Sequence, residues 1–267
     1  MLQFALRCLS TFSVCKQLKD IVPKSKWVAL ILILLAIVAI GAWAYFVYYE
    51  SERIDKLRKL QFTVVKDDVE GFANIKVGSN SYKVHEDLEN PKDAAIQMDN
   101  LNTQAMKLIA FLNMKYIKRP EAMKAMKAIK SNKQKIVRNG IKSLVKNFKT
   151  ANLEENIPER SGGDTSYVIN KGDVFAMCIR DPKQKNKIED NTNDLTFVLI
   201  HELAHLFTSS YGHDKLFWHN FRFLLEEAVE AGVYTPVNYN QTGSPYCGIV
   251  VTYSPLFDET LTTYKTN

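Results

Sequence analysis

One stretch organises this 267-residue chain: Phe197-Val-Leu-Ile-His201-Glu202-Leu-Ala-His205-Leu-Phe-Thr208. It is typical of an apolar helix that contains the pattern His-Glu-x-x-His. Because an α-helix turns once in about 3.6 residues, His201 and His205 lie on one face, close enough to bind one ion. Zinc binds neutral imidazoles at about 2.0–2.1 Å and, in catalytic sites, keeps one position open for water.

Glu202 follows the first histidine, where its carboxylate can take a proton from water instead of binding the metal itself. The helix is apolar on most sides, which is typical of a buried helix. Buried imidazoles and a buried carboxylate need partners, because an unpaired buried polar group costs a few kcal/mol. We therefore predict a zinc (Zn²⁺) site in which His201 and His205 are ligands and Glu202 is the catalytic base. The alternative is a core helix whose histidines have other partners.

A third ligand has to come from outside this helix. The helix should end near Ser209-Ser210-Tyr211-Gly212, since glycine suits a C-terminal cap or tight turn. His213 follows directly and can fold back to the metal, so we predict it as the third ligand. The alternatives are Asp214 beside it and Glu226 or Glu227 on the next helix, Lys215–Ala231. His219 lies on a different helical face from His213, which indicates a surface or supporting residue.

The N-terminal part of the chain carries a membrane-spanning pattern. Residues 1–26 are basic, and Trp27–Tyr49 then runs 23 residues without a charge. That length spans about 30 Å of hydrocarbon, and aromatic residues crowd its ends as they do at membrane interfaces. A cleaved signal peptide is the alternative, with Ala42-Trp43-Ala44 as its cleavage site. We favour an uncleaved anchor that binds the lipid bilayer through Trp27–Tyr49.

The charges around this span predict its orientation. Positive residues precede it and a mixed flank follows, so the N-terminus should be cytosolic and the rest lumenal or exterior, or on a virion membrane. In such a compartment Cys178 and Cys247 could oxidise, together or with partners. The sequence Asn240-Gln-Thr242 would also become a candidate glycan acceptor.

The segment between the anchor and the metal helix mixes strands and helices. Ile75–Val84 alternates around Gly78-Ser-Asn, which predicts a β-hairpin, and His85 after it is predicted to be an ordinary surface residue. An apolar stripe over residues 93–114 predicts a helix, Pro120 begins another and Ile141–Phe148 marks a third. The stripe consists of Met98, Leu101, Ala105, Leu108 and Leu112.

A run of basic residues covers these helices, with thirteen lysines and arginines and one acid between Lys107 and Lys149. Such a block could bind the phosphates of nucleic acid or anionic lipid heads. The alternative, which we favour, is a solvated helical face.

Two strands are predicted just before the metal helix. Thr165–Arg180 alternates around Asn170-Lys171-Gly172-Asp173, and the second strand is Val174–Ile179. Asn191-Thr-Asn193-Asp194 then caps the helix. A strand in this position can take up an extended substrate as an additional strand.

These residues resemble the WLM/SprT-like zinc metallopeptidases. The resemblance rests on His201-Glu-x-x-His205 with Gly212-His213-x-x-x-Phe217-Trp218, and it extends through Phe221–Ala228 and Tyr246-Cys-Gly248. Membrane-anchored sequences of this group from giant DNA viruses and algae look similar over Tyr82–Leu256. The resemblance implies that His201, His205 and His213 are ligands, that Glu202 is the base and that the Phe/Trp pair packs beneath the site. The eight-residue interval from His205 to His213 is longer than is usual in the group.

The predicted fold class is α+β: a zincin-like domain with a small β-sheet and the HExxH helix, preceded by a single N-terminal transmembrane helix. The predicted parts are a basic tail (1–26), the transmembrane helix (27–49), a juxtamembrane segment with the hairpin (50–88) and the metallopeptidase domain (89–267). The predicted function is zinc-dependent hydrolysis of peptide bonds in a protein or peptide substrate. The alternative is a structural membrane or virion protein with a non-catalytic zinc site, which a fourth protein ligand would indicate. An oxyanion-stabilising donor is also expected; the candidates are Tyr234, Tyr239, Tyr246 and Tyr253.

Overall fold

The computed structural model describes residues 64–66, 71–119 and 121–266, together with Val38, Gly41 and Tyr45. The chain divides into two units, Met1–Leu60 and Gln61–Asn267. In the first unit, Val38, Gly41 and Tyr45 have helical backbone conformation, and the rest of the predicted anchor lies outside the described residues. Among the helices that are described, none combines the length and the apolar character needed to cross a bilayer.

The second unit is built on a mixed sheet of six strands, ordered β1-β2-β3-β4-β6-β5. The strands are β1 (Val64–Lys66), β2 (Phe72–Val77), β3 (Asn80–His85), β4 (Leu153–Asn156), β5 (Tyr167–Ile169) and β6 (Val174–Cys178). Strands β3, β4 and β6 run parallel, whereas the β1/β2, β2/β3 and β5/β6 pairs are antiparallel. The predicted hairpin and the predicted strand pair before the metal helix are both confirmed. Strand β5 lies at the edge of the sheet and pairs only with β6 among the described strands.

Three helices connect β3 to β4. They are α4 (Pro91–Asn113), which continues as a π-helical turn over Met114–Lys118, then α5 (Ala122–Lys127) and α6 (Gln134–Asn147). The five residues of the predicted apolar stripe on α4 are fully buried, and α4 packs on β2 and β3. The helix predicted from Ile141–Phe148 corresponds to α6, on which Ile141 and Leu144 are buried and Val145 is 48% exposed.

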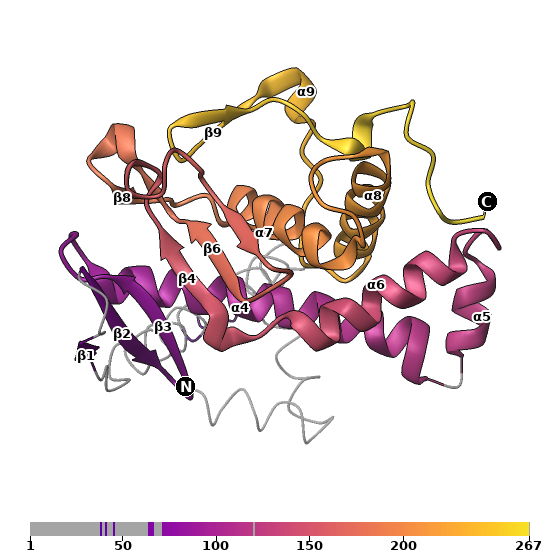
Figure 1. Cartoon of the computed structure of the whole chain (residues 1–267), viewed down its shortest axis with the longest axis horizontal. Coiled ribbons are helices and arrows are strands. Elements are labelled where there is room, and N and C mark those ends of the chain that lie inside the picture. The colour runs from indigo at the N-terminus through magenta and orange to yellow at the C-terminus, as the bar shows by residue number, and fades with distance from the viewer. Residues whose placement is uncertain are drawn as a thin grey trace, which may run out of the picture. The chain divides into compact units, whose positions relative to one another are not determined.

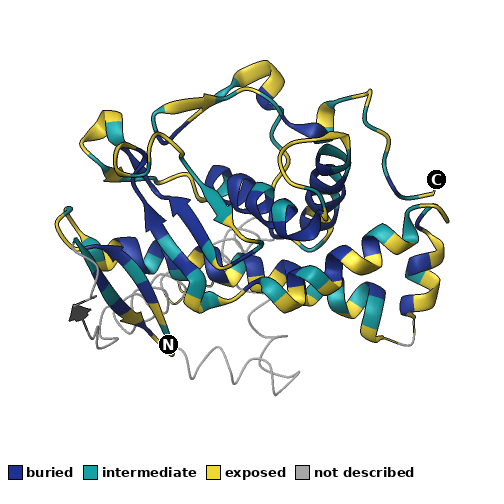
Figure 2. Ribbon diagram, in the orientation of Figure 1, coloured by how far each residue is buried: buried dark blue, intermediate teal, exposed yellow. Residues whose placement is uncertain are grey.

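Helix α7 (Thr192–Phe207) is the centre of this unit, with β6 on one side and α8 (Lys215–Glu230) on the other (Figure 1). The side chain of Asn191 caps α7 by accepting a hydrogen bond from the Asp194 backbone N–H, as predicted. Helix α6 crosses α7 where Gly140 meets Phe207; a Cβ at position 140 would lie 2.4 Å from the phenyl ring. Figure 2 shows that α7 and the central strands β4 and β6 are largely buried. The unit is therefore an α+β domain with the predicted metal helix in its core.

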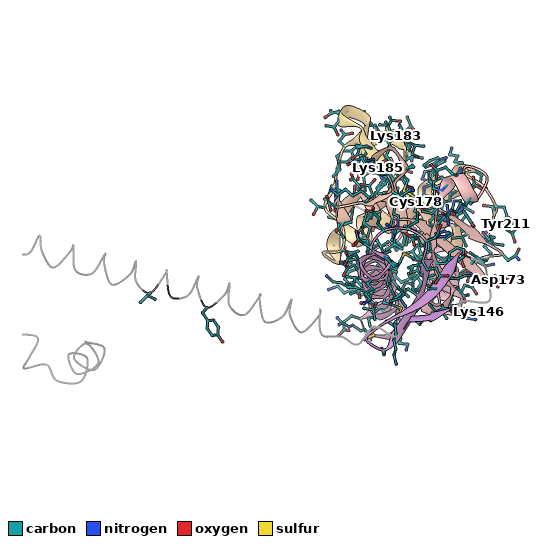
Figure 3. The ribbon with its side chains drawn as sticks, turned by 90° about the vertical axis from the view of Figure 1, so that its left-hand side faces the viewer. Lys146, Asp173, Cys178, Lys183, Lys185 and Tyr211 are labelled. Atoms are coloured by element: carbon teal, nitrogen blue, oxygen red, sulfur yellow. A yellow bond between two sulfur atoms is a disulfide. The ribbon has the colours of Figure 1, made fainter. Side chains whose placement is uncertain are left out.

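The remaining elements are short. Strands β7 (Arg180–Asp181) and β8 (Lys187–Ile188) form one two-stranded sheet, and β9 (Ser244–Tyr246) and β10 (Ile249–Val251) form another after the short helix α9 (Tyr239–Thr242). Asn240 of the candidate glycan acceptor is an exposed residue of α9. Cys178 at the end of β6 forms a disulfide with Cys247, with 6.3 Å between the Cα atoms. Figure 3 shows Cys178 in the interior of the unit. This bond joins the β9–β10 hairpin to the sheet.

Candidate metal centre

Three histidine rings converge beside α7. His201 and His205 project from successive turns of the helix, and His213 reaches them from the loop that follows Gly212, whose φ of 73° makes the turn. The Nε2 atom of His213 lies 2.9 Å from Nε2 of His201 and 3.1 Å from Nε2 of His205. The three donor atoms all lie within 4.8 Å of one another. The structure thus brings together the three residues that the sequence predicts as ligands.

The charge state of these rings suits a cation. Burial, then the neighbouring rings of His205 and His213, lower the pKa of His201 to about 3. Burial, then His213 and Lys171, lower the pKa of His205 to about 4. Burial also lowers the pKa of His213. The rings are therefore neutral near pH 7, which is the form that binds zinc.

The spacing of the rings also suits zinc. Two ligand nitrogens at about 2.0–2.1 Å from a tetrahedral ion lie about 3.3 Å apart. The observed separations of 2.9 and 3.1 Å are close to that value. The residues present therefore fit a zinc ion held by three imidazoles.

Glu202 lies beside this cluster with an unmet hydrogen bond. It is 3% exposed, and its Oε2 atom has no hydrogen-bond partner among the described residues. Burial, then the charge of Asp164, raise the pKa of Glu202 to about 8. A buried carboxylate oxygen without a partner costs about 1–3 kcal/mol, so it calls for a functional explanation.

The alternative ligands are used elsewhere in the fold. The Asp214 carboxylate accepts a hydrogen bond from the Phe217 backbone N–H at 2.8 Å and caps α8. Glu226 pairs with Arg222 at 3.1 Å. Glu227 is fully buried and pairs with Lys115 and Lys265, each at 2.8 Å. Each of these three carboxylates therefore has a partner or a capping role within the fold.

Aromatic rings of α8 pack against the three imidazoles. Phe217 is fully buried, and its ring centroid lies 4.4 Å from that of His205, 4.7 Å from His213 and 4.9 Å from His201. Trp218 lies 5.7 Å from the His213 ring, but it is only partly buried. The prediction that this pair packs beneath the site is therefore confirmed for Phe217. Trp218 also contacts the site, but it is less buried than predicted. Sequence reasoning missed Phe221, whose ring lies 5.1 Å from His201.

Lys171 supports the same loop from the turn between β5 and β6. Its Nζ atom donates to the carbonyl oxygens of His205 at 3.0 Å, Thr208 at 2.7 Å and Ser210 at 2.6 Å. It also lies 4.6 Å from the centre of the Tyr211 ring, a residue at the surface of the unit in Figure 3. Lysine is favourable at a helix C-terminus because it binds the last free carbonyls. A lysine in a turn belongs to no recognisable sequence motif. The sequence therefore did not indicate that Lys171 would bind the carbonyl oxygens at the end of α7.

Two cavities adjoin the cluster and share Ser166, His201, Glu202 and His213. One, of ≈ 280 Å³, has Asp164, Lys171 and Tyr211 on its wall. The other, of ≈ 330 Å³, is lined by apolar residues of α7, α8 and β10. We name them the polar cavity and the apolar cavity.

The four candidate tyrosines fall into two pairs. Tyr246 and Tyr253 line the apolar cavity, whereas Tyr234 and Tyr239 pack around Phe197 at the start of α7. The Tyr246 hydroxyl donates to the Cys178 carbonyl at 2.9 Å and lies 2.7 Å from Ser166 Oγ. The Tyr253 hydroxyl donates to Asp258 at 2.6 Å. Only Tyr246 and Tyr253 therefore adjoin the centre among the four.

This part of the chain is similar to known proteins. The model of the WLM domain family matches residues 104–264, which contain His201, Glu202, His205 and His213. The chain is 34% identical over 104 residues to an uncharacterized protein of Acanthamoeba polyphaga mimivirus, covering 39% of this chain and 51% of the relative. It is 39% identical over 72 residues to an uncharacterized protein of Invertebrate iridescent virus 6, covering 27% of this chain and 40% of the relative. The chain thus spans about half the length of these relatives or less. No solved structure matches.

Proposed function

The chain belongs to the WLM domain family, and from this we propose that it is a zinc-dependent metallopeptidase. In this proposal His201, His205 and His213 hold zinc, and Glu202 is the general base for hydrolysis of a peptide bond. One observation carries it: three neutral imidazoles meet at one point beside a buried carboxylate oxygen that has no partner among the described residues. Metal ligation and proton transfer give both groups a role.

Bound at this point, zinc supplies a Lewis acid that polarises the scissile carbonyl and lowers the pKa of its water from 15.7 towards about 7. The chain's own residues perform the rest. Glu202 accepts the proton of the attacking water and passes it to the leaving amine. Phe217 holds the three rings in place.

Strand β5 is the proposed platform for the substrate. Tyr167 and Val168 of β5 and Ser166 before it line the polar cavity next to His201 and His205. Because β5 is an edge strand, an extended peptide can pair with it and pass the centre with its backbone hydrogen bonds satisfied. Peptide and protein substrates are therefore proposed rather than compact small molecules.

A purely structural zinc site receives less support. Such sites are usually closed by four protein ligands and are rich in cysteine. Within residues 71–119 and 121–266, the cluster contains three histidines, and Cys178 and Cys247 are bonded to each other. The unpaired Glu202 also has no purpose in a structural site.

Membrane attachment and orientation are proposed from the sequence. We propose that Trp27–Tyr49 anchors the protein and that the peptidase unit lies on the lumenal or exterior side. The Cys178–Cys247 disulfide supports this, since disulfides persist mainly in oxidising compartments. Protease protection on intact membranes tests it: digestion of the C-terminal unit from the cytosolic side alone would reverse the orientation.

The basic helices are involved partly in internal contacts. Lys107 donates to the Gly232 carbonyl, Lys115 to Glu227 and Glu230, and Lys130 to the Thr263 carbonyl. These contacts give those three residues a role within the fold. Binding of anionic lipid or nucleic acid by the remaining lysines and arginines stays a prediction.

The proposed function is tested with the full chain in detergent, loaded with zinc and offered a peptide library. Cleavage should require zinc, and Glu202→Gln should lower kcat by about 10²–10⁴-fold while zinc content is unchanged. His201→Ala should lose zinc and activity together. Equal cleavage by wild type and Glu202→Gln would show that the activity does not come from this site.

A further inference from the structure

The apolar cavity has a composition that the general reaction does not explain. It lies between three elements: α7 contributes Phe197 and Val198, α8 contributes Trp218 and Phe221, and β10 contributes Ile249 and Val251. Hydrolysis needs only the metal centre, a base and a bound peptide backbone. Apolar residues that line a cavity beside the reacting atoms instead favour substrates whose side chain fits that cavity.

The size of the cavity limits what it can take. A cavity of about 150 Å³ lined by apolar side chains can hold a benzene molecule. The apolar cavity, at ≈ 330 Å³, therefore has room for one large side chain such as Leu, Met or Phe. The polar cavity on the same centre presents Asp164 and Lys171, so the two sides differ in the side chains they favour.

The side of the cavity formed by β10 is held against β6, although some of its residues are exposed. Ile249 is 50% exposed and adjoins the cavity. The Cys178–Cys247 disulfide and the hydrogen bond from Tyr246 to the Cys178 carbonyl tie the hairpin to β6. Exposed apolar residues on a tethered hairpin at the mouth of a cavity are typical of a ligand groove.

We propose that this site, given the peptidase function proposed above, selects peptides with a large apolar side chain on a residue adjoining the cleaved bond. That side chain occupies the apolar cavity between α7, α8 and β10. Burial of a side chain of this size favours such peptides over those with Ala by on the order of 10- to 200-fold in kcat/KM. Asp or Lys at the same position is disfavoured further, because its charge would be moved from water to the apolar side of the cavity formed by Val198, Phe221 and Val251.

The experiment uses zinc-loaded full chain in detergent and peptides that differ only in the residue on either side of the cleaved bond. Leu or Phe should exceed Ala, Asp and Lys at one of the two positions, and the favoured position tells which side of the bond the cavity serves. Equal kcat/KM for Leu and Asp at both positions would overturn the inference while leaving the peptidase function intact.

Two neighbouring substitutions on β10 form a matched pair. Val251 lines the cavity, whereas Val250 beside it is 56% exposed and is not part of the wall. Val251→Asp should reduce the preference for Leu over Ala at least tenfold, and Val250→Asp should leave it unchanged. Loss of the preference in both variants would indicate a general effect on the hairpin and would count against the cavity as the selecting element.

Binding separates the inference from the proposed function. Fluorescently labelled peptides titrated onto Glu202→Gln should show the same Leu-over-Asp preference in Kd. Selective binding without cleavage by wild type would support the cavity and contradict the peptidase. Binding with no preference would overturn the cavity whatever the activity.

Discussion

The buried His85 and the more exposed histidines of the metal centre differ in what surrounds them. His85, at the end of β3, is 4% exposed, and its Nδ1 atom lies 3.0 Å from Nη1 of Arg160. Its backbone N–H donates to Glu155 at 2.7 Å, and Glu155 in turn pairs with Arg180 at 2.6 Å. The ring nitrogens of His201, His205 and His213 instead face one another.

The comparison shows that burial by itself does not mark a metal ligand. His85 was predicted to be a surface residue, and that prediction is wrong: the ring packs against Phe72 with 4.0 Å between centroids, inside a cluster of charged groups. Within that cluster the ring contacts Arg160, and the Glu155 carboxylate accepts hydrogen bonds from the His85 backbone N–H and from Arg180 Nε. Arg180 Nη1 donates to the Glu89 carbonyl, and its Nη2 has no partner among the described residues. At the metal centre three ring nitrogens converge beside a carboxylate oxygen of Glu202 that has no partner among the described residues, and this combination indicates function.

The first test breaks the paired cluster. Arg180→Met removes the partner of Glu155, leaving a buried carboxylate without its cation, which should lower the free energy of unfolding by about 3–5 kcal/mol. Denaturant titration measures the loss. Zinc content of the folded protein should be unchanged, because the two clusters share no residue. Lys187→Met, which removes the exposed pair with Asp190, is the matched control and should leave stability unchanged within error.

Zinc should stabilise the fold through one cluster only. Free zinc at about 1,000 times its Kd should add about 4 kcal/mol to the unfolding free energy, and a chelator should reverse the gain. The gain should vanish in His201→Ala and persist in His85→Gln. A zinc effect that depends on His85 would show that the comparison assigns the wrong histidine.

His85 of the paired cluster should contribute to the pH dependence of stability. Burial, then the charge of Arg160, lower the pKa of His85 from 6.5 to about 4, while Asp87 acts in the opposite direction and Arg180 adds a smaller lowering effect. The unfolded chain therefore takes up a proton below about pH 6.5, and the folded chain only near pH 4. This stability is fully present above pH 6.5 and is lost as the pH falls to 4, by about 3 kcal/mol in total.

Unfolding free energies measured from pH 7.5 to 4 check this in the zinc-free protein. His85→Gln should have a flatter profile between pH 6.5 and 4, since glutamine does not titrate there. Parallel profiles for the variant and wild type would mean that the pKa of His85 is the same in the folded and unfolded chains.

The smallest expected effect concerns Lys171, which contacts the loop that carries His213. Lys171→Met leaves the carbonyls of His205, Thr208 and Ser210 without their shared donor, so the His213 loop should be less well held. Zinc affinity should fall about tenfold, equivalent to about 1.4 kcal/mol. Lys171→Arg, which keeps a charged donor, should restore most of it in a competition titration with a zinc indicator. Equal affinities in all three proteins would make Lys171 dispensable for the centre.

The sequence by itself determined the elements whose evidence is local. The spacing of His201 and His205, the Asn191 cap, the apolar stripe of α4 and the hairpin before it all depend on periodicity or on residues a few positions apart. Such patterns specify which face of an element is buried, because helices and strands have fixed repeats. They therefore predicted the α+β class, the metal helix and Glu202 beside its first histidine.

Only the tertiary structure decided which distant groups meet. Sequence left Asp214, Glu226 and Glu227 as alternatives to His213, and they were separated by their contacts with Phe217, Arg222 and Lys115. The pairing of Cys178 with Cys247 and the burial of His85 depended in the same way on chain segments that approach across the sheet. The physical reason is that a side chain's partner, and hence its charge state and its freedom to bind a metal, is set by neighbours in space, and periodicity along the chain does not specify them.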